Sequence, residues 1–305
     1  MNTARVSAII VSYNSLGTID ASLGSLRKAH DAGFLDCFVV DNTSSDGTVA
    51  FVARAHPWVT LIESGKNLGY GRGCNLALDR VTTPYVLFMN ADAVIGPEDI
   101  LTLERFLEEH PAAGMAAPAL VETDGGLQGT RALPTPVSIL AEAAGTTAGR
   151  ADERLIHPGG QPFEAEWLCG AVLLADSVLL KELGGFDPRF FLYFEETDLC
   201  RRVRMRGRQL WAVGEAVARH AAHDSAAKTQ KEMYEGCIAE HYYPSRFYYI
   251  EKQYGRAAAM ATDAGEIALL AGRALLGRIA RRSKGRLSQR LRAPAFRPPK
   301  AWPSP

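Results

Sequence analysis

Short runs of apolar, β-branched residues alternate with stretches of helical spacing through the first ninety residues of the chain. The expected strands are 6–11, 37–40, 59–62 and 85–89, and the expected helices between them are 17–32, 48–55 and 70–80. Each strand is apolar on both faces, which is typical of a parallel sheet covered by helices. The pattern therefore predicts an α/β fold with a mostly parallel central sheet flanked by helices.

Beyond about residue 118 the alternation becomes irregular. We expect a buried strand over 167–174 and helices over 196–206, 228–254 and 265–292. Five prolines among the last twelve residues predict a disordered end.

Charge is distributed unevenly along the 305 residues, although 34 basic and 34 acidic side chains balance overall. Residues 265–305 hold 10 Lys or Arg and 1 Asp or Glu, a net charge of +9, which leaves the preceding residues at −9. This segregation predicts a contact between the basic end and an anionic membrane surface. A solvated helix packed on the domain is the alternative. Nucleic acid is disfavoured as a partner, because no aromatic residues are interleaved with the basic ones over 265–292.

The five cysteines stand more than 30 residues apart and include no C-x-x-C pair. This spacing fits neither a disulfide framework nor a zinc site. About six apolar residues follow Arg5, too few for the core of a signal peptide. No run of 18 uncharged apolar residues occurs either. We therefore expect a cytoplasmic protein, or one held at the inner face of the plasma membrane by its basic end.

Polar residues follow the predicted strands, at the edge where open parallel sheets bind ligands. Asp41 ends the second strand, where a carboxylate can accept hydrogen bonds from a ribose or a base. Asp41 and Asp46 would equally serve to close a turn and cap a helix. Asn90 and Asp92 end the fourth strand and suit a hard divalent cation that also holds phosphates. An aspartate there is also a common cap or turn residue.

A glycine-rich loop runs from Asn67 to Asn75, with the sequence NLGYGRGCN. Glycines let the backbone approach a phosphate or a sugar, and Arg72 adds positive charge. Tight packing of a helix on the sheet is the alternative use of these glycines. A dinucleotide fingerprint requires G-x-G-x-x-G after the first strand, whereas the spacing here is G-x-G-x-G after the third. The sequence therefore disfavours a nicotinamide-dependent oxidoreductase.

Three carboxylates crowd the start of the helix predicted from residue 196, directly behind an aromatic run. They are Glu195, Glu196 and Asp198. Acidic residues at a helix N-terminus complement the helix dipole. Because like charges repel, one of them can instead acquire the raised pKa of a general base. His220 follows a short strand, and a single histidine at such a place is more often structural.

Taken in order, six segments resemble the inverting GT-A glycosyltransferases of family 2, in particular their rhamnosyltransferase-like branch, which also has N-x-D where others have D-x-D. The segments are VSAIIVSYNS, VVDNTSSDGT, NLGYGRGCNLAL, FMNADAVI, GGFDPRFFLYFEETDLCRRVRMRG and the stretch 220–225. They span roughly 6–254. The resemblance implies a GT-A nucleotide-diphospho-sugar transferase domain over 1–255. Its nucleotide-binding half would be about 1–117 and its acceptor half about 118–255, with a basic helical extension over 256–305.

The resemblance also implies roles for the matching residues. The nucleotide-sugar donor would be bound by Ser12, Tyr13, Asn14, Asp41, Asn67, Arg72, Asn90 and Asp92. The wall between donor sugar and acceptor would comprise Trp167, Gly170, Ala171 and Glu195. A divalent cation, Mg²⁺ or Mn²⁺, would be held by Asp92 and His220. Because Asn90 removes one negative charge from this site, we expect weak, donor-dependent metal binding.

Inversion requires one base on the face of the sugar opposite the leaving group. Glu196 stands where the family usually has Asp in an E-D-x-D run, which here reads E-E-T-D. Glu196 is the expected base, with Asp198 in reserve. The expected reaction transfers L-rhamnose from dTDP-rhamnose to a hydroxyl of a bacterial cell-surface glycan or a polyprenyl-linked precursor. The alternatives are a UDP-hexose or UDP-N-acetylhexosamine donor, and a catalytically inactive relative that binds glycans.

Overall fold

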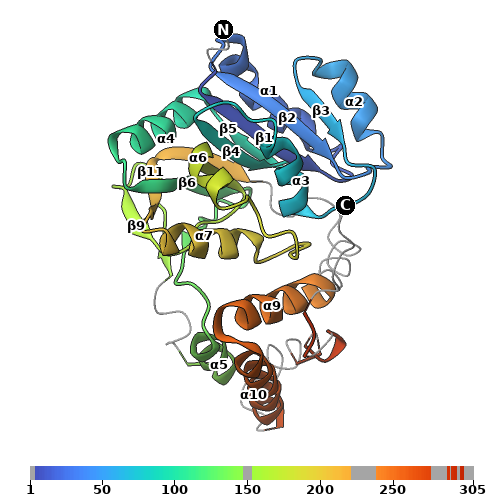
Figure 1. Cartoon of the computed structure of the whole chain (residues 1–305), viewed down its shortest axis with the longest axis vertical. Coiled ribbons are helices and arrows are strands. Elements are labelled where there is room, and N and C mark those ends of the chain that lie inside the picture. Colours follow the sequence, from blue (N-terminus) through green and yellow to red (C-terminus); the bar gives the residue numbers. More distant parts are fainter. Residues whose placement is uncertain are drawn as a thin grey trace. The chain divides into compact units, whose positions relative to one another are not determined.

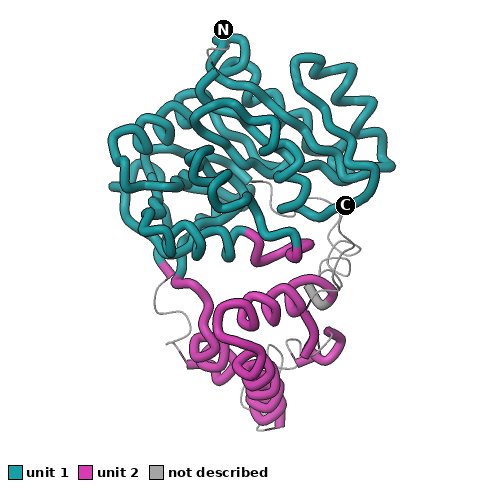
Figure 2. Tube along the Cα trace, in the orientation of Figure 1, with its two compact units in different colours: residues 1–131, 154–188, 196–224 teal, residues 132–153, 189–195, 225–305 magenta. Residues whose placement is uncertain are grey.

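A computed structural model of the chain describes residues 4–146, 153–220, 238–275, 287–288, 290–293 and 296–298. The chain divides into two compact units, coloured separately in Figure 2. Unit 1 comprises Met1–Arg131, Arg154–Pro188 and Glu196–Asp224, and unit 2 comprises Ala132–Glu153, Arg189–Glu195 and Ser225–Pro305. The expected nucleotide-binding half, acceptor half and extension stay predictions, because they concern what each part of the chain binds.

Unit 1 is built on a mixed sheet, which has nine strands in the described residues. The order is β3-β2-β1-β4-β10-β6-β11-β5, and β9 pairs with β11. The strands are β1 (Val6–Ser12), β2 (Leu35–Asp41), β3 (Thr60–Glu63), β4 (Tyr85–Asn90), β5 (Ala93–Ile95), β6 (Ala113–Glu122), β9 (Phe163–Ala165), β10 (Val172–Asp176) and β11 (Gln209–His220). Two further strands, β7 (Gly129–Thr130) and β8 (Arg154–Leu155), pair with each other.

Most of the long strands end at the same edge of this sheet. β1 is parallel to β2 and β4, and β2 is parallel to β3. β10 runs antiparallel to both β4 and β6, while β11 is parallel to β6. The expected mostly parallel sheet is therefore confirmed, with β10 reversed near its middle and the short strands β5 and β9 antiparallel to β11.

Helices pack around this sheet, as the alternation in the sequence predicts (Figure 1). They are α1 (Ile19–Asp31), α2 (Thr48–Ala55), α3 (Tyr70–Leu78), α4 (Pro97–Glu109), α6 (Ser177–Glu182) and α7 (Glu195–Met205). Ile19, Leu23 and Leu26 share one face of α1 and are fully buried in the core with Ile10 and Leu87. Their spacing of three and four residues is what places them on one face.

The strand predicted over 167–174 is only partly present, because β10 begins at Val172. The preceding residues turn at the edge of the sheet instead of joining it. The carbonyl of Ala171 accepts a hydrogen bond from the Asn90 N–H at 2.9 Å. A continuous apolar run in the sequence cannot reveal such a turn, since a strand and a turn would bury the same side chains.

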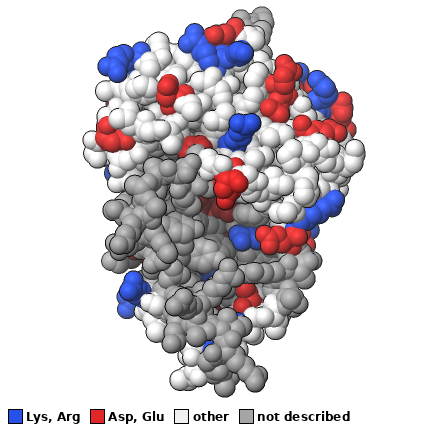
Figure 3. Space-filling view, turned by 180° about the vertical axis from the view of Figure 1, so that it is seen from behind, with Lys and Arg blue, Asp and Glu red and all other residues white. Residues whose placement is uncertain are grey.

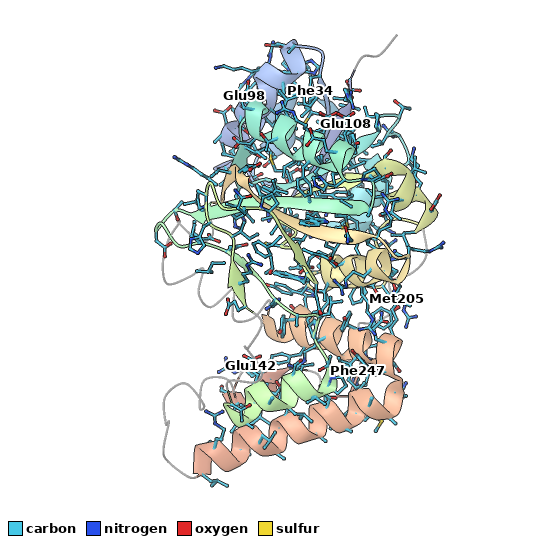
Figure 4. All side chains as sticks on the ribbon, turned by 90° about the vertical axis from the view of Figure 1, so that its left-hand side faces the viewer. Phe34, Glu98, Glu108, Glu142, Met205 and Phe247 are labelled. Carbon is cyan, nitrogen blue, oxygen red and sulfur yellow. The ribbon has the colours of Figure 1, made fainter. Side chains whose placement is uncertain are left out.

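Unit 2 is helical in its described residues. It contains α5 (Pro136–Ala144), a short π-helical turn (Ile238–Tyr242), α9 (Tyr243–Tyr254) and α10 (Arg256–Leu275). Its core is largely aromatic and includes Phe190, Phe194, Tyr249 and Phe247, the last labelled in Figure 4.

The two C-terminal helix predictions are confirmed in part. The end of the helix predicted over 228–254 is present as α9, while residues 228–237 lie outside the described part of the chain. The helix predicted over 265–292 begins earlier, at Arg256, because an alanine-rich stretch favours helix there. Residues 276–286 and most of the proline-rich end lie outside the described residues.

A cluster of four buried charges joins α9, α10 and the segment around Arg290. Arg246 donates to both carboxylate oxygens of Glu266. Arg290, with no exposed surface, donates from Nε to Glu266 Oε2 at 2.9 Å and lies 2.5 Å from Asp263 Oδ2. Both guanidinium groups also lie over the ring of Tyr243, at 5.0 Å and 4.9 Å from its centre. Two positive and two negative groups thus balance each other where water is excluded.

The expected membrane contact of the basic end is not tested by the described residues. No helix among them is long and apolar enough to cross a bilayer. On the face shown in Figure 3, the acidic and basic side chains that are described lie interspersed. Most of the basic residues of 265–305 lie outside the described part of the chain, so their contact stays a prediction.

Candidate functional site

Asp41 joins the loops that follow β1 and β2. It is 1% exposed, and it accepts hydrogen bonds from the Ser12 hydroxyl at 2.9 Å and from the Ser44 N–H at 2.8 Å. Asn14, in the loop after β1, also reaches the loop after β2. It adopts a left-handed backbone (φ 52°), and its side-chain oxygen accepts the Ser45 N–H at 2.8 Å. Asp41 therefore braces two loops at the strand ends, and its expected contact with a ribose or base stays a prediction. Tyr13, which the sequence places beside it, is exposed.

The glycine-rich loop before α3 is held by its own side chains. Asn67 Oδ1 accepts the Gly69 N–H at 3.0 Å, and Gly69 has a φ of 79°, which favours glycine. A Cβ at Gly73 would lie 3.0 Å from both methyl groups of Val11. These two glycines therefore have structural roles in the turn and in the packing of α3 on β1. Arg72, on the same helix, is buried.

His220 lies between two carboxylates at the end of β11. Its Nε2 is 3.2 Å from Asp92 Oδ1 and 3.4 Å from Asn90 Nδ2, and its Nδ1 is 3.7 Å from Glu122 Oε1. Burial lowers the pKa of His220, but the two carboxylates raise it by more, so the pKa is raised overall. Strand register explains this meeting, because His220 pairs with Ala93 of β5 and with Glu122 of β6.

The pair of Asp92 and His220 is the candidate cation site. Within the described residues, no three His, Cys, Asp or Glu side chains are arranged to hold a metal ion by themselves. A carboxylate is nevertheless a suitable ligand for Mg²⁺ or Mn²⁺, and imidazole is a common metal ligand in proteins. A cation that also binds substrate phosphates needs few protein ligands. The residues present therefore fit a cation that shares its coordination with a diphosphate.

Glu196 lies in the first turn of α7, against the segment that leads into β10. A Cβ at Gly170 would stand 3.3 Å from Glu196 Cβ, so the two residues are in close contact. Glu196 keeps part of its surface exposed, but burial raises the pKa of its carboxyl. The helix backbone, the charge of Arg131 and the hydroxyl of Thr197 act in the opposite direction. A raised pKa suits a general base.

The neighbouring acids are placed differently. Asp198 has no exposed surface, and Arg202 donates to its Oδ2 from Nε at 2.7 Å. Arg202 also donates to the carbonyls of Leu183 and Gly185, so this pair anchors α7 to the chain after α6. Glu195 is buried at the helix start. The geometry thus favours Glu196 over Asp198 as the group that reaches an acceptor.

Three of the four expected wall residues are fixed to their surroundings by hydrogen bonds: Trp167, Gly170 and Ala171. The Gly170 carbonyl accepts the Tyr70 hydroxyl at 3.4 Å, and Ala171 is bonded to Asn90 as described above. The indole N–H of Trp167 donates to Thr197 Oγ1 at 3.0 Å. This segment therefore lies beside both the candidate base and the candidate cation site.

Three residues of this site were missed by the sequence analysis: Glu122, Arg131 and Thr197. Glu122 ends β6, and the guanidinium carbon of Arg131 lies 4.4 Å from the centre of the Trp167 ring. Thr197 stands at the unassigned position of the E-E-T-D run, and its link to Trp167 depends on tertiary structure. Glu122 and Arg131 belong to no motif, and they meet His220 and Trp167 only through tertiary structure.

Two rhamnosyltransferases are similar to this chain in sequence. N-acetylglucosaminyl-diphospho-decaprenol L-rhamnosyltransferase of Mycobacterium tuberculosis is 28% identical over 239 residues, which are 71% of this chain and 76% of the relative. Rhamnosyltransferase WbbL of Escherichia coli is 25% identical over 170 residues, which are 52% of this chain and 63% of the relative.

Solved structures share the fold. TarS of S. aureus in complex with UDP-GlcNAc has a TM-score of 0.58 at 16% identity, covering 94% of this chain and 79% of that one. Mannosyltransferase PcManGT of Pyrobaculum calidifontis, in complex with GDP-Man and Mn²⁺, has a TM-score of 0.54 at 19% identity, covering 94% of this chain and 84% of that one. These likenesses confirm the expected GT-A fold.

The sequence profile of the family described as "Glycosyl transferase family 2" matches residues 7–165, which is more than half of the chain. The matched stretch contains the loops braced by Asp41, the glycine-rich loop and the Asn90-Ala91-Asp92 motif. The chain therefore belongs to glycosyl transferase family 2.

Proposed function

We propose that this family 2 glycosyltransferase transfers L-rhamnose from dTDP-rhamnose to a hydroxyl of a polyprenyl-linked glycan precursor, with inversion at the anomeric carbon. The proposal draws its sugar and its acceptor from the names of the two rhamnosyltransferase relatives. The observation that carries it is the bond between the Asn90 N–H and the Ala171 carbonyl. It joins the cation site to the segment against which Glu196 packs, so that donor diphosphate and base would share one edge of the sheet.

The donor would bind across the ends of β1, β2 and β4. The exposed ring of Tyr13 is available to a nucleotide base, while Asp41 keeps the surrounding loops in place. Asp92 and His220 would hold Mg²⁺ or Mn²⁺ on the diphosphate. Such a cation offsets the negative charge that develops on the leaving nucleoside diphosphate.

Glu196 would take the proton of the acceptor hydroxyl as its oxygen attacks the anomeric carbon. The new bond joins that oxygen to the sugar, and the bond between the sugar and the diphosphate breaks. Attack from the face opposite the leaving group inverts the configuration. The raised pKa of Glu196 supports its ability to accept the proton.

Other donors compete with dTDP-rhamnose in this proposal. The structural relatives were solved with GDP-Man and with UDP-GlcNAc, so the fold alone does not select one nucleotide sugar. An inactive glycan-binding relative is the remaining alternative, and its support is Asn90 in place of a second carboxylate.

A calorimetric donor screen tests the proposal directly. The protein is titrated with dTDP-rhamnose, UDP-glucose, UDP-galactose, UDP-GlcNAc and GDP-mannose, with and without Mn²⁺. We expect selective binding of dTDP-rhamnose that strengthens with Mn²⁺. Selective binding of a different donor would show that the proposed sugar is wrong. If the folded protein binds none of the donors, the alternative of an inactive glycan-binding relative is favoured.

Transfer itself is tested with the variant Glu196→Gln, which should bind the donor and fail to turn it over. The matched control is Glu182→Gln, the same chemical change at an exposed position at the end of α6. Full transfer activity of the Glu196→Gln variant would show that Glu196 is not the base.

A further inference from the structure

A directed chain of hydrogen bonds ends on the candidate base. The indole N–H of Trp167 donates to Thr197 Oγ1 at 3.0 Å, and the Thr197 hydroxyl donates to Glu196 Oε1 at 3.3 Å. All three residues belong to unit 1. Glu196 and Thr197 are adjacent on α7, whereas Trp167 comes from the segment before β10.

The direction of this chain follows from the chemistry of its members. An indole nitrogen can only donate, and a hydroxyl has a single proton to give. Once Trp167 occupies a lone pair of the Thr197 oxygen, the hydroxyl proton is free to point at the Glu196 carboxylate. Trp167 is 9% exposed and Thr197 is 2% exposed, so water competes little for either group.

Arg131 contacts Trp167, the first donor in this series of hydrogen bonds. Its guanidinium carbon lies 4.4 Å from the centre of the Trp167 ring, within the range of a cation–π contact. This contact restricts the indole plane and therefore the direction in which its N–H points. The same positive charge favours the ionised form of Glu196, and because Arg131 is exposed this effect is screened by salt.

Other titratable groups face Glu196 but do not share this role. The thiols of Cys169 and Cys200 lie nearby, and burial raises the pKa of each to about 12. Both thiols are therefore neutral at physiological pH. The negative charge of Glu122, at the end of β6, contributes to the raised pKa of Cys169. Thr197, Arg131 and the helix backbone are thus what oppose the effect of burial on Glu196.

We propose that Thr197, Trp167 and Arg131 are positioning residues that hold the Glu196 carboxylate in one orientation, with Oε1 bound to Thr197 and Oε2 left for the acceptor hydroxyl. The inference rests on the proposed function, in which Glu196 is the base. Removing the Thr197 hydroxyl should therefore weaken proton transfer and leave the donor site unchanged.

The test compares Thr197→Val, Thr197→Ser and Trp167→Phe with the unmodified protein. The assay uses dTDP-rhamnose and a synthetic N-acetylglucosaminyl-diphospho-lipid as acceptor. Thr197→Val should lower kcat roughly ten- to a hundredfold, the loss typical of a hydrogen bond to a charged group. The Kd of the donor should not change. The acidic limb of the pH–rate profile should move to higher pH, because the ionised base has lost a donor.

Two further variants separate positioning from folding. Thr197→Ser should restore most of the rate, and Trp167→Phe should shift the profile in the same direction as Thr197→Val. Thr102→Val is the control, because it removes a threonine hydroxyl that bonds a carbonyl of α4. If Thr197→Val unfolds, the decision rests on Trp167→Phe, which keeps an aromatic ring in place.

The variant Glu196→Gln separates the role of Glu196 as the base from the role of its hydrogen-bonded neighbours. If Glu196→Gln is active, Glu196 is not the base. If Glu196→Gln is inactive but folded Thr197→Val and Trp167→Phe keep the original kcat and pH profile, the positioning chain is refuted. A ¹³C NMR titration of the Glu196 carboxyl, assigned by its absence in Glu196→Gln, reads the same effect without turnover. An unchanged midpoint in Thr197→Val overturns the proposal there as well.

Discussion

Gly170 lies directly against Glu196: a Cβ at Gly170 would stand 3.3 Å from Glu196 Cβ and 3.4 Å from its Cγ. Contacts this short force one neighbour to move by a few tenths of an ångström. Because both short contacts are with Glu196, the displacement would fall first on the candidate base.

We therefore expect Gly170→Ala to lower kcat while the Kd of the donor stays the same. A misplacement of about 1 Å can cost on the order of a hundredfold in rate, so a tenfold loss is a reasonable expectation for this smaller shift. Gly24→Ala serves as the control, because a Cβ there meets no atom within 4 Å. An unchanged kcat would mean that Glu196 moves without consequence, which argues against its role.

Asn90 offers a gain-of-function test of the cation site. Asn90→Asp adds a second carboxylate beside Asp92 and His220, so Mn²⁺ should bind more tightly. The concentration of Mn²⁺ that gives half-maximal donor binding should fall in calorimetry. Asp92→Asn should have the opposite effect. If neither substitution changes the dependence on Mn²⁺, the cation does not bind at this pair.

The raised pKa of Glu196 implies a cost in stability. Burial raises this pKa above its ordinary value of 4.5, so the folded chain holds the carboxylate less favourably than the unfolded chain at any pH above that value. Glu196→Gln should therefore raise the melting temperature at pH 7. The difference should decrease as the pH falls and vanish well below 4.5, where the group is protonated in both states. A lower melting temperature for Glu196→Gln at pH 7 would contradict the direction of the shift.

The charge cluster in unit 2 predicts that the segment around Arg290 contributes to folding. Arg290→Ala leaves Asp263 and Glu266 with Arg246 alone, and breaking a buried ion pair costs about 3–5 kcal/mol. Thermal unfolding should show a clear loss of stability. Arg292→Ala removes the same charge at an exposed position and should be neutral. Equal effects of the two variants would show that Arg290 is not buried in solution.

This cluster also decides how membrane binding by the basic end must be tested. Deleting residues 265–305 would remove Glu266 and Arg290 together with the basic charge. Replacing Arg281, Arg282 and Lys284 by glutamine changes the charge and keeps the cluster. We expect this variant to sediment less with anionic liposomes than the unmodified protein. If the variant and the unmodified protein sediment equally, the basic end does not bind the liposomes through these charges, and the alternative of a solvated helix packed on the domain is favoured.

The sequence predicts the first half of the fold well because local patterns determine it there. The spacing of Ile19, Leu23 and Leu26 shows which face of α1 is buried, and short apolar runs mark β1 to β4. The start of α10 at Arg256 was less evident, because favourable helix residues extended the helix beyond the apolar spacing on which the prediction rested.

The site was predictable only where the residues form motifs. Asp92 and His220 were paired through a resemblance, since residues so far apart in the sequence meet only through the register of β5 and β11. The link from Trp167 to Thr197 could not be anticipated, because it depends on the turn that precedes β10. By contrast, the pairing of Asp198 with Arg202 follows the one-turn spacing of a helix and was available to sequence reasoning.

Because β10 runs antiparallel to its neighbours β4 and β6, the end of β6 at Glu122 and the start of β10 at Val172 lie at the same edge of the sheet. The intervening stretch therefore starts and finishes beside the site, and within it the short strand β9 pairs with β11. It can lengthen, shorten or be exchanged between homologues without rethreading β1, β2 or β4, to none of which its short strands pair. A change in this stretch would therefore alter the surface beside the proposed base and leave unchanged the strand ends that are proposed to carry the donor.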